Sequence, residues 1–486
     1  MRESHRYLLA CTLQLLCLKV LAGAALAADT ASTGQTLYLQ NCAICHGKSL
    51  EGVAGPSLID PVWVHGSADQ QVANSIRNGF PVQGMPAFRD TLDENAVAAL
   101  VDYLRARRTA VAEQQAHLAA ANPPSGPPQG VVRSEVEDFR VERIAHVEAP
   151  FGLALLPGGD MLITQTDGQL RQIVKGQLLP KAIAGTPLGN PGDLFRRKLM
   201  DVIAHPNYAA NGWIYLASTD GAMEGSGDTR ALWTLTRGRI RDGRWVDGKV
   251  IIQLPVDGTA GKMAFDRNGF LYITNAWSGY SYLGKPEEAS AQKLDNSEGK
   301  VLRLHDDGRV PADNPFVNQP GAYPYIWSYG HRSALGIAFD GAGNLWATEN
   351  GPRGGDELNL IKAGRNYGWP VITWGHRYDK RPESSNTEQE GMEQPIVSWV
   401  PAIAISSIAY YNGAAFPRWR NSLIAGSLKK RDLMRLKLDG ERVVLQETLL
   451  PNMDRIRDVD VGEDGLVYLL TDSGDVLRLM PADAQQ

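Results

Sequence analysis

The sequence predicts a multidomain chain in which a small all-α domain is followed by an all-β six-bladed β-propeller. Three observations lead to this fold class. Apolar residues recur at helical spacing within residues 31–107. After residue 131 that periodicity gives way to β-hairpin patterns that recur six times, at intervals of about 45 to 80 residues. Between the two parts lies a proline-rich stretch that suits neither a helix nor a strand.

The first 27 residues have the three parts of a secretory signal peptide. Arg2 and Arg6 make the start basic, an apolar run follows from Tyr7, and Ala25-Leu26-Ala27 offers a cleavage site. Lys19 interrupts the apolar run, and no later stretch approaches the length that crosses a bilayer. We therefore expect a periplasmic protein that does not span the membrane after the signal is removed. The formal net charge of −5 gives no electrostatic footprint for nucleic acid.

The stretch Asn41-Cys42-Ala43-Ile44-Cys45-His46-Gly47 indicates a covalently attached haem c. The thiols of Cys42 and Cys45 add to the haem vinyl groups, and His46 is then held under the iron as the proximal ligand. A redox Cys-x-x-Cys pair or half of a zinc site is the alternative. Zinc would need a second pair of ligands, and the other two cysteines of the chain, Cys11 and Cys17, lie in the signal peptide. No disulfide framework is expected.

A sixth iron ligand is found by elimination. Met85 is the only methionine of this part of the mature chain, and His65 is the rival ligand. Ligation by a thioether and an imidazole raises the iron potential and suits electron transfer. A methionine at this distance from the haem motif, braced by Pro86, resembles the distal ligand loop of class I cytochromes c. We expect such a domain over residues 30–108.

Three helices are predicted in this domain, over residues 33–39, 68–78 and 92–107. Ser67 is placed to cap the second helix, and Gly79 is placed to end it. In cytochromes c the first and last helices cross beside the haem, and the order here matches. The stretch after the third helix contains four prolines within residues 122–128. We expect a semi-rigid linker over residues 109–135.

Residues 136–483 carry the six hairpin patterns and are predicted to form the propeller. Each pattern is a β-run, a turn rich in Gly, Asn or Asp, and a second β-run. The copies begin near Phe151, Leu199, Lys262, Leu335, Ile408 and Asp458. Each hairpin alone leaves an apolar face exposed, and closing the ring buries that face. Long loops are expected to gather at one end of the channel, where propellers bind ligands.

Cationic residues stand beside glycines in several of these loops. Arg332 precedes the fourth hairpin, Lys429 follows a strand of the fifth, and Arg455 and Arg457 open the sixth. The side chains in Arg455-x-Arg457 project to the same face of a strand. Arginine binds carboxylates bidentately, so this set suits a ligand with several carboxylates.

A glycine-rich stretch around Gly351 and Pro352 leaves backbone carbonyls free, as a hard cation such as calcium requires. The alternative interpretation of all these charges is a ring of surface ion pairs. Its acidic partners would be Asp356, Glu357 and Asp458.

Residues 140–480 resemble the soluble PQQ-dependent glucose/aldose sugar dehydrogenases, the glucose/sorbosone dehydrogenase family of six-bladed propellers. The most specific match runs from Ile326-Trp327-Ser328-Tyr329-Gly330-His331-Arg332 to Asn366-Tyr367-Gly368-Trp369-Pro370. The resemblance implies that PQQ accepts a hydride from the anomeric carbon of an aldose. It also implies roles for residues: Arg332 polarises the quinone oxygens, Lys429, Arg455 and Arg457 hold the PQQ carboxylates, and Gly351 and Pro352 offer carbonyls to a Ca²⁺ that bridges to PQQ.

Two departures from the family bear on the chemistry. Gly258 stands where the family has its catalytic histidine. Asp257 is the nearest titratable residue and our expected substitute base, with His331 and His205 as further candidates; an aspartate needs a raised pKa for this work near neutral pH. Basic residues 196–198 replace a family segment that helps to hold sugar, which suggests an acidic sugar as substrate.

Two functions therefore compete. In the first, the propeller oxidises a sugar with PQQ and the fused haem takes the electrons, for delivery to a periplasmic or membrane electron acceptor. In the second, the propeller has lost its chemistry and serves as a binding or docking module for the cytochrome. The missing histidine favours the second function. The retained cations favour the first, because a docking module has no evident use for them.

Overall fold

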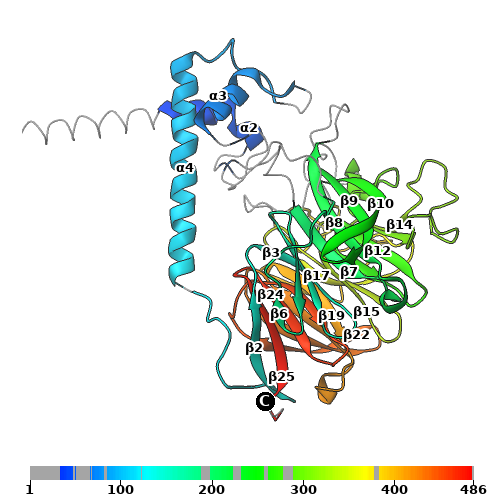
Figure 1. The fold of residues 1–486 in the computed structure, drawn as a ribbon. Helices are drawn as coiled ribbons and strands as arrows, with labels where there is room; N and C mark the ends of the chain where they lie inside the picture. Colours follow the sequence, from blue (N-terminus) through cyan, green and yellow to red (C-terminus); the bar gives the residue numbers. More distant parts are fainter. Residues whose placement is uncertain are drawn as a thin grey trace, which may run out of the picture. The chain divides into compact units, whose positions relative to one another are not determined.

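A computed structural model describes residues 33–46, 50, 58, 66, 68–81, 85–121, 123–187, 198–222, 231–256, 261–276, 288–376 and 383–483. The chain divides into two compact units, Met1–Pro123 and Pro124–Gln486 (Figure 1). Among the described helices, none combines the length and the apolar character needed to cross a membrane. The expected signal peptide and His65 lie outside the described residues.

The N-terminal unit is helical, as predicted. Its helices cover residues 33–41, α2 (Ala43–His46), α3 (Asp69–Asn78) and α4 (Glu94–Ala121). The first helix crosses α4 at Gly34, where a Cβ atom would overlap the carbonyl oxygen of Ala99. Tyr38 packs against Tyr103 beside this crossing, with ring centroids 5.5 Å apart. The crossing of the first and last helices is therefore present.

The structure differs from the expected linker at both ends. Helix α4 continues to Ala121, because residues 109–121 are rich in alanine and other strong helix formers. Strand β1 (Val131–Arg133) occupies the far end. Between them, the Ser125 amide donates to the Asn452 carbonyl at 2.8 Å, so this part of the predicted linker is attached to the propeller.

The described strands of the second unit form six antiparallel sheets, one for each predicted blade. Blade 1 holds β3 (Pro150–Leu155), β4 (Met161–Gln165), β5 (Leu170–Val174) and β6 (Gln177–Leu178). Blade 2 holds β7 (Lys198–Ala204), β8 (Ile214–Ala222), β9 (Ala231–Arg241) and β10 (Arg244–Val256). Blade 3 holds β11 (Met263–Phe265), β12 (Phe270–Asn275), β13 (Lys300–His305) and β14 (Ile326–Tyr329).

Blade 4 holds β15 (Ala334–Phe339), β16 (Leu345–Glu349), β17 (Asp356–Ile361) and β18 (Val397–Trp399). Blade 5 holds β19 (Ile405–Tyr411), β20 (Ser422–Ser427), β21 (Leu433–Asp439) and β22 (Arg442–Leu450). Blade 6 holds β23 (Ile456–Val461), β24 (Val467–Thr471) and β25 (Asp475–Pro481). Short helical turns α5 (Tyr208–Asn211), η3 (Ser290–Gln292) and η4 (Pro417–Trp419) lie in loops.

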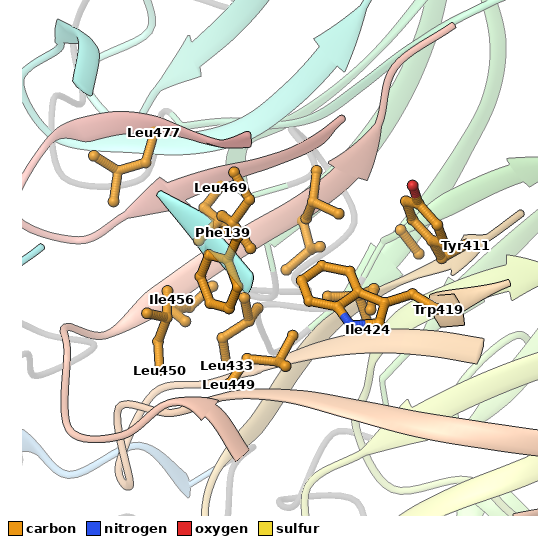
Figure 2. Packing of buried hydrophobic residues seen from close by; sticks show 14 of the residues in the cluster. Phe139, Tyr411, Trp419, Ile424, Leu433, Leu449, Leu450, Ile456, Leu469 and Leu477 are labelled. Carbon is orange, nitrogen blue, oxygen red and sulfur yellow. The ribbon is translucent and has the colours of Figure 1, made fainter. Parts of the chain in front are cut away.

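The ring closes where the start of the propeller meets its end. Strand β2 (Asp138–His146) pairs with β25, with Phe139 opposite Pro481 and His146 opposite Asp475. Phe139 is fully buried and meets Trp419 edge-on, with ring centroids 5.5 Å apart. Figure 2 shows it among apolar side chains of blades 5 and 6. The six-bladed propeller predicted from the hairpins is confirmed.

The first strand of each blade lines the centre of the ring. These innermost strands contact one another in the closed order β3, β7, β11, β15, β19, β23 and back to β3. Each is antiparallel to the second strand of its blade. The starts of the innermost strands and the ends of the second strands therefore lie at one end of the propeller, which we call the mouth.

Candidate active site

The fold brings the predicted cationic residues to the mouth. Arg332 directly precedes β15, and Lys429 follows β20. Arg455 precedes β23 and Arg457 lies within it, while Gly351 and Pro352 follow β16. Residues from three blades thus share one end of the channel, although long stretches of sequence separate them.

Arg332 is held by its neighbours in blade 4. Its backbone amide donates to Oε2 of Glu349 at 2.9 Å, and its Nη1 donates to the carbonyl of Asn350 at 2.8 Å. The guanidinium lies 5.3 Å from the ring centre of Trp369. Its Nε is buried and has no hydrogen-bond acceptor within the described part of the chain. A ligand at the mouth would meet a fixed cation with one donor unused.

The buried residues behind Arg332 fix its position. The ring of His331 is 1% exposed; its Nδ1 lies 2.8 Å from Oε1 of Glu349, and its Nε2 lies 2.8 Å from Oγ of Ser328. Burial opposes ionisation of Glu349, but His331 and the hydrogen bonds outweigh it and lower the pKa of Glu349. His331 is therefore a buried support for Arg332, out of reach of a substrate.

Arg455 and Arg457 share one carboxylate, as expected for side chains on the same face of a strand. Asp472 accepts from Nε of Arg455 at 2.6 Å, and from Nε and Nη2 of Arg457 at 2.7 and 2.9 Å. Burial raises the pKa of Asp472, yet the two arginines outweigh burial and the pKa lies below its ordinary value. The acidic partner is thus Asp472, which follows β24, rather than any of the three acids considered from the sequence.

Lys429 is exposed at the rim of the mouth. Its backbone amide donates to the carbonyl of Ile403 at 3.0 Å. No acidic partner of its ammonium group is present among the described residues, so the charge is available to a ligand.

The loop around Gly351 is tightly folded. The amide of Gly351 donates to Oδ1 of Asp356 at 2.9 Å, and a Cβ atom at Gly351 would overlap the carbonyl oxygens of Gly354 and Gly355. Asp356 is fully buried and also caps the amides of Ile403 and Ile405 at 2.9 and 3.0 Å. This acid therefore supports the loop and joins blades 4 and 5. In the described ranges no group of three or more acidic, histidine or cysteine side chains is placed to hold a metal, so a cation here would depend on backbone oxygens.

Further along the innermost strands the channel contains a buried ion cluster. Nζ of Lys262 lies 2.7 Å from Oδ1 of Asp201 and 2.7 Å from Oδ2 of Asp458. Burial lowers the pKa of Lys262, but the two carboxylates outweigh it and raise this pKa above its ordinary value. Burial raises the pKa of Asp201 to about 6, against the charge of Lys262.

The ion cluster also joins neighbouring blades. Both acids also accept a backbone amide of a neighbouring blade: Asp201 from Met263, and Asp458 from Leu153, each at 2.9 Å. A cavity of about 20 Å³ lies beside the cluster and is lined by residues of all six innermost strands or their starts, including Phe151, Ser406 and Arg457. It has room for about one water molecule.

The candidate bases are placed differently. Asp257 and Gly258 lie outside the described residues, as do Arg196 and Arg197. His205 follows the end of β7, at the end of the propeller opposite the mouth, and its Nδ1 accepts from the amide of Asn207 at 2.9 Å. His205 and His331 are thus both removed from the mouth surface.

In the N-terminal unit the predicted haem ligands lie in ordered segments. Cys45 and His46 belong to α2, and the amides of Cys45 and His46 both donate to the carbonyl of Cys42. Burial raises the pKa of the Cys42 thiol to about 11. Met85 is half-buried in a short hairpin, where its amide and carbonyl both bond Phe80.

Sequence reasoning missed most of the residues that act through long-range pairing, and it considered Asp458 only as a partner of the cations at the mouth. Lys262, Asp201 and Asp458 come from blades 3, 2 and 6, and Asp472 lies after the strand that follows its arginines. One signal was available: Asp201 and Asp458 lie in the first β-run of a hairpin copy, and Asp472 directly follows the second β-run of the sixth copy.

Residues 147–478 match the family described as "Glucose / Sorbosone dehydrogenase", and residues 29–104 match "Cytochrome C oxidase, cbb3-type, subunit III". The chain is 36% identical to "Aldose sugar dehydrogenase YliI" of Escherichia coli over 69% of this chain and 91% of that protein. It is 39% identical to "Cytochrome c-551" of Bacillus subtilis over 16% of this chain and 65% of that protein.

Solved structures agree with the sequence relatives. The soluble aldose sugar dehydrogenase of Escherichia coli in its apo form superposes with a TM-score of 0.64 and 34% identity, covering 71% of this chain and 99% of that one. The propeller, its mouth and the matched residues lead to one conclusion: the chain belongs to the glucose/sorbosone dehydrogenase family and carries a cytochrome c domain at its N-terminus.

Proposed function

We propose that this protein is a periplasmic quinohaemoprotein that oxidises an aldose-type sugar with PQQ and Ca²⁺ at the propeller mouth and passes the electrons to its own haem c. The single observation that carries the proposal is the set of cations at the mouth, with Arg332 fixed from behind and retaining an unused donor. Membership of a sugar dehydrogenase family supports the reaction class.

The residues at the mouth fit PQQ, a planar quinone with three carboxylates. Lys429, Arg455 and Arg457 supply positive charge for the carboxylates, and bidentate pairing of the kind that Arg457 makes with Asp472 suits them. The unused Nε of Arg332 is a donor for a quinone oxygen. The loop at Gly351 and Pro352 offers the oxygen ligands that Ca²⁺ prefers.

Bound PQQ supplies a two-electron acceptor for a hydride from the sugar. The protein's part is to orient the reactants and to manage charge and protons. Arg332 would stabilise negative charge on a quinone oxygen at its unused donor, and it would do so without reorganisation because Glu349 and Asn350 already hold it. Beside the ion cluster around Lys262 the channel has room for about one water molecule, which limits water near the mouth.

A base must take the proton of the sugar hydroxyl as the hydride leaves. We propose Asp257, because it is the titratable residue nearest the position of the family's histidine, in the stretch that precedes Lys262. Gly261 begins the described segment after it, and the side chain of Lys262 points into the ion cluster. Asp257→Asn should abolish turnover without changing PQQ affinity; unchanged turnover would exclude this residue as the base.

Fusion of the two domains has a kinetic purpose in this proposal. A tethered acceptor is present at a high effective concentration, in the millimolar range for a short flexible connection. Cys42, Cys45 and His46, with Met85 as the proposed sixth ligand, would hold a haem that supplies a one-electron acceptor. A further periplasmic or membrane electron acceptor would complete the transfer.

The experiment is reconstitution of the purified haem-loaded protein with PQQ and Ca²⁺. A panel of neutral aldoses and acidic sugars is added, and haem reduction is followed by absorbance. Reduction that requires both PQQ and a sugar supports the proposal. If PQQ fails to bind, the alternative of a non-catalytic docking propeller, which the glycine at position 258 favours, takes its place.

A further inference from the structure

We propose that a second cavity, at the end of the propeller opposite the mouth, binds a single neutral sugar ring. The cavity measures about 250 Å³ and lies between the β11–β12 and β15–β16 turns of blades 3 and 4. Both turns follow the ends of innermost strands, so the cavity is remote from Arg332 and its neighbours. It is slightly smaller than the usual range of small-molecule sites, about 300–1,000 Å³, which suits a monosaccharide better than a larger ligand.

Aromatic rings form one wall of the cavity. Tyr272 of β12 meets Trp327 of β14 edge-on at 5.4 Å, and Phe339 of β15 edge-on at 5.1 Å. The three rings line the cavity and come from two blades, so the sheets hold them rigidly. A pyranose ring presents C–H groups on its faces. Packing these groups against aromatic carbon lowers the free energy, because it removes apolar surface from water.

One donor on this wall has no acceptor in the described part of the chain: Nε1 of Trp327 is buried and unpaired there. A buried donor without an acceptor costs free energy that a ligand oxygen restores. A sugar hydroxyl is suited to this role because it accepts and donates.

The charged groups around the cavity favour a neutral ligand. Two acids, Asp266 and Asp340, and two cations, Arg267 and Lys362, line it, and Lys362 also pairs with Glu441. Asp340 is saturated by the amides of its own turn and by the Asn344 and Trp346 side chains. Asp266 would repel a bound anion, and Arg267 would repel a bound cation.

Enough polar capacity remains to bind hydroxyl groups. Oδ1 of Asp266 accepts the amides of Asn268 and Phe270, each at 2.9 Å, while its Oδ2 has no donor among the described residues. Arg267 lies against Gly343, where a Cβ atom would meet its guanidinium, and it has no acidic partner in the same described ranges. The exposed amide of Asn268 adds one more donor and acceptor.

The test measures sugar binding to the full-length haem protein without PQQ or Ca²⁺, by ligand-observed NMR titration. Glucose and xylose are the neutral probes, and glucuronate and glucosamine are charged probes of the same ring size. We expect saturable binding of the neutral probes at one site. Each charged probe should bind about tenfold more weakly. Equal binding of all four probes would overturn the proposal.

Variants assign the binding to this cavity. Arg267→Ala combined with Asn268→Ala removes two polar partners and should raise the dissociation constant at least about tenfold. Trp327→Phe keeps an aromatic ring, removes the unpaired N–H and should raise it about fivefold. Arg442→Ala, an exposed arginine of blade 5, is the matched control and should change nothing.

The mouth provides the remaining control. Arg457→Gln alters the opposite end and should leave this binding unchanged. Loss of binding in Arg457→Gln, or unchanged binding in the Arg267/Asn268 double variant, would contradict the proposal. So would the absence of any sugar binding, which would make the cavity a water-filled crevice. Because no PQQ is present, none of these results bears on the proposed oxidation chemistry.

Discussion

Two groups of charged residues at the centre of the propeller differ in what their cations neutralise. At the mouth, Arg455 and Arg457 share one acid, Asp472, and the Arg455 side chain is 47% exposed. Further along the channel, one cation, Lys262, neutralises two acids whose side chains are each 4% exposed. The mouth thus has cationic capacity to spare, and the ion cluster has none. Spare exposed charge is suited to a ligand, whereas buried charge that is already paired is suited to joining blades.

The largest expected effect comes from breaking the buried cluster. Lys262→Met leaves two buried carboxylates without their cation and should lower the free energy of unfolding by about 3–5 kcal/mol. Chemical denaturation measures it. The same substitution at Lys362, which makes an exposed pair with Glu441, should cost about 0–1 kcal/mol. Similar losses in the two variants would contradict the distinction.

At the mouth, a substitution should affect ligand binding more than it affects the free energy of unfolding. Arg457→Gln removes a cation and the guanidinium hydrogens that Asp472 leaves free for a ligand carboxylate, and the dissociation constant of PQQ should rise about 10- to 100-fold. Arg455 remains beside Asp472, so the unfolding free energy should change by less than about 1 kcal/mol. Calorimetric titration with PQQ and Ca²⁺ measures the first quantity. A variant that unfolds as readily as Lys262→Met would place Arg457 with the structural ions.

The pH dependence of stability should also differ between the ion cluster and the mouth. Burial raises the pKa of Asp460, a neighbour of the ion cluster, to about 7. A folded pKa above the unfolded value near 3.9 means that this group's stabilisation is full below about pH 4 and is lost as pH rises through 7. The loss reaches at most about 1.4 kcal/mol per pH unit. Asp472, whose folded pKa is lowered, acts in the opposite direction.

The pH prediction is tested by Asp460→Asn. Unfolding free energies are measured between pH 4 and 8 for both proteins. The variant should lose less stability than the wild type as pH rises towards 7, since it has no carboxyl to ionise. Parallel pH profiles would contradict the raised pKa.

The smallest effect is expected at the rim. Lys429→Gln removes one exposed charge, so PQQ affinity should fall only a few-fold and become less sensitive to salt. The free energy of unfolding should change by no more than about 0.5 kcal/mol. Titrations at low and high salt provide the test, and an unchanged salt dependence would show that Lys429 does not contact the ligand.

Local patterns predicted much of this molecule. The alternation in Arg455-x-Arg457 placed both side chains on one face, and both contact Asp472. Hairpin repeats gave the six blades because strand period and turn residues are short-range signals.

Long-range partners were not predictable in the same way. Lys262 gains its role only when blades 2 and 6 bring Asp201 and Asp458 beside it. The linker was expected over residues 109–135, but α4 continues to Ala121 and β1 begins at Val131. The start was placed too early because the prolines drew more attention than the helix-forming residues that precede them. The segment around Asp257 stays a prediction.

The central claim is that electrons from a sugar oxidised in the propeller reach the haem of the same chain. Its most direct test is stopped-flow haem reduction in the PQQ- and Ca²⁺-loaded protein after mixing with saturating sugar, at several protein concentrations. We predict reduction at a rate independent of protein concentration, as intramolecular transfer requires. A rate proportional to protein concentration, or a haem that stays oxidised while PQQ is reduced, would contradict the account.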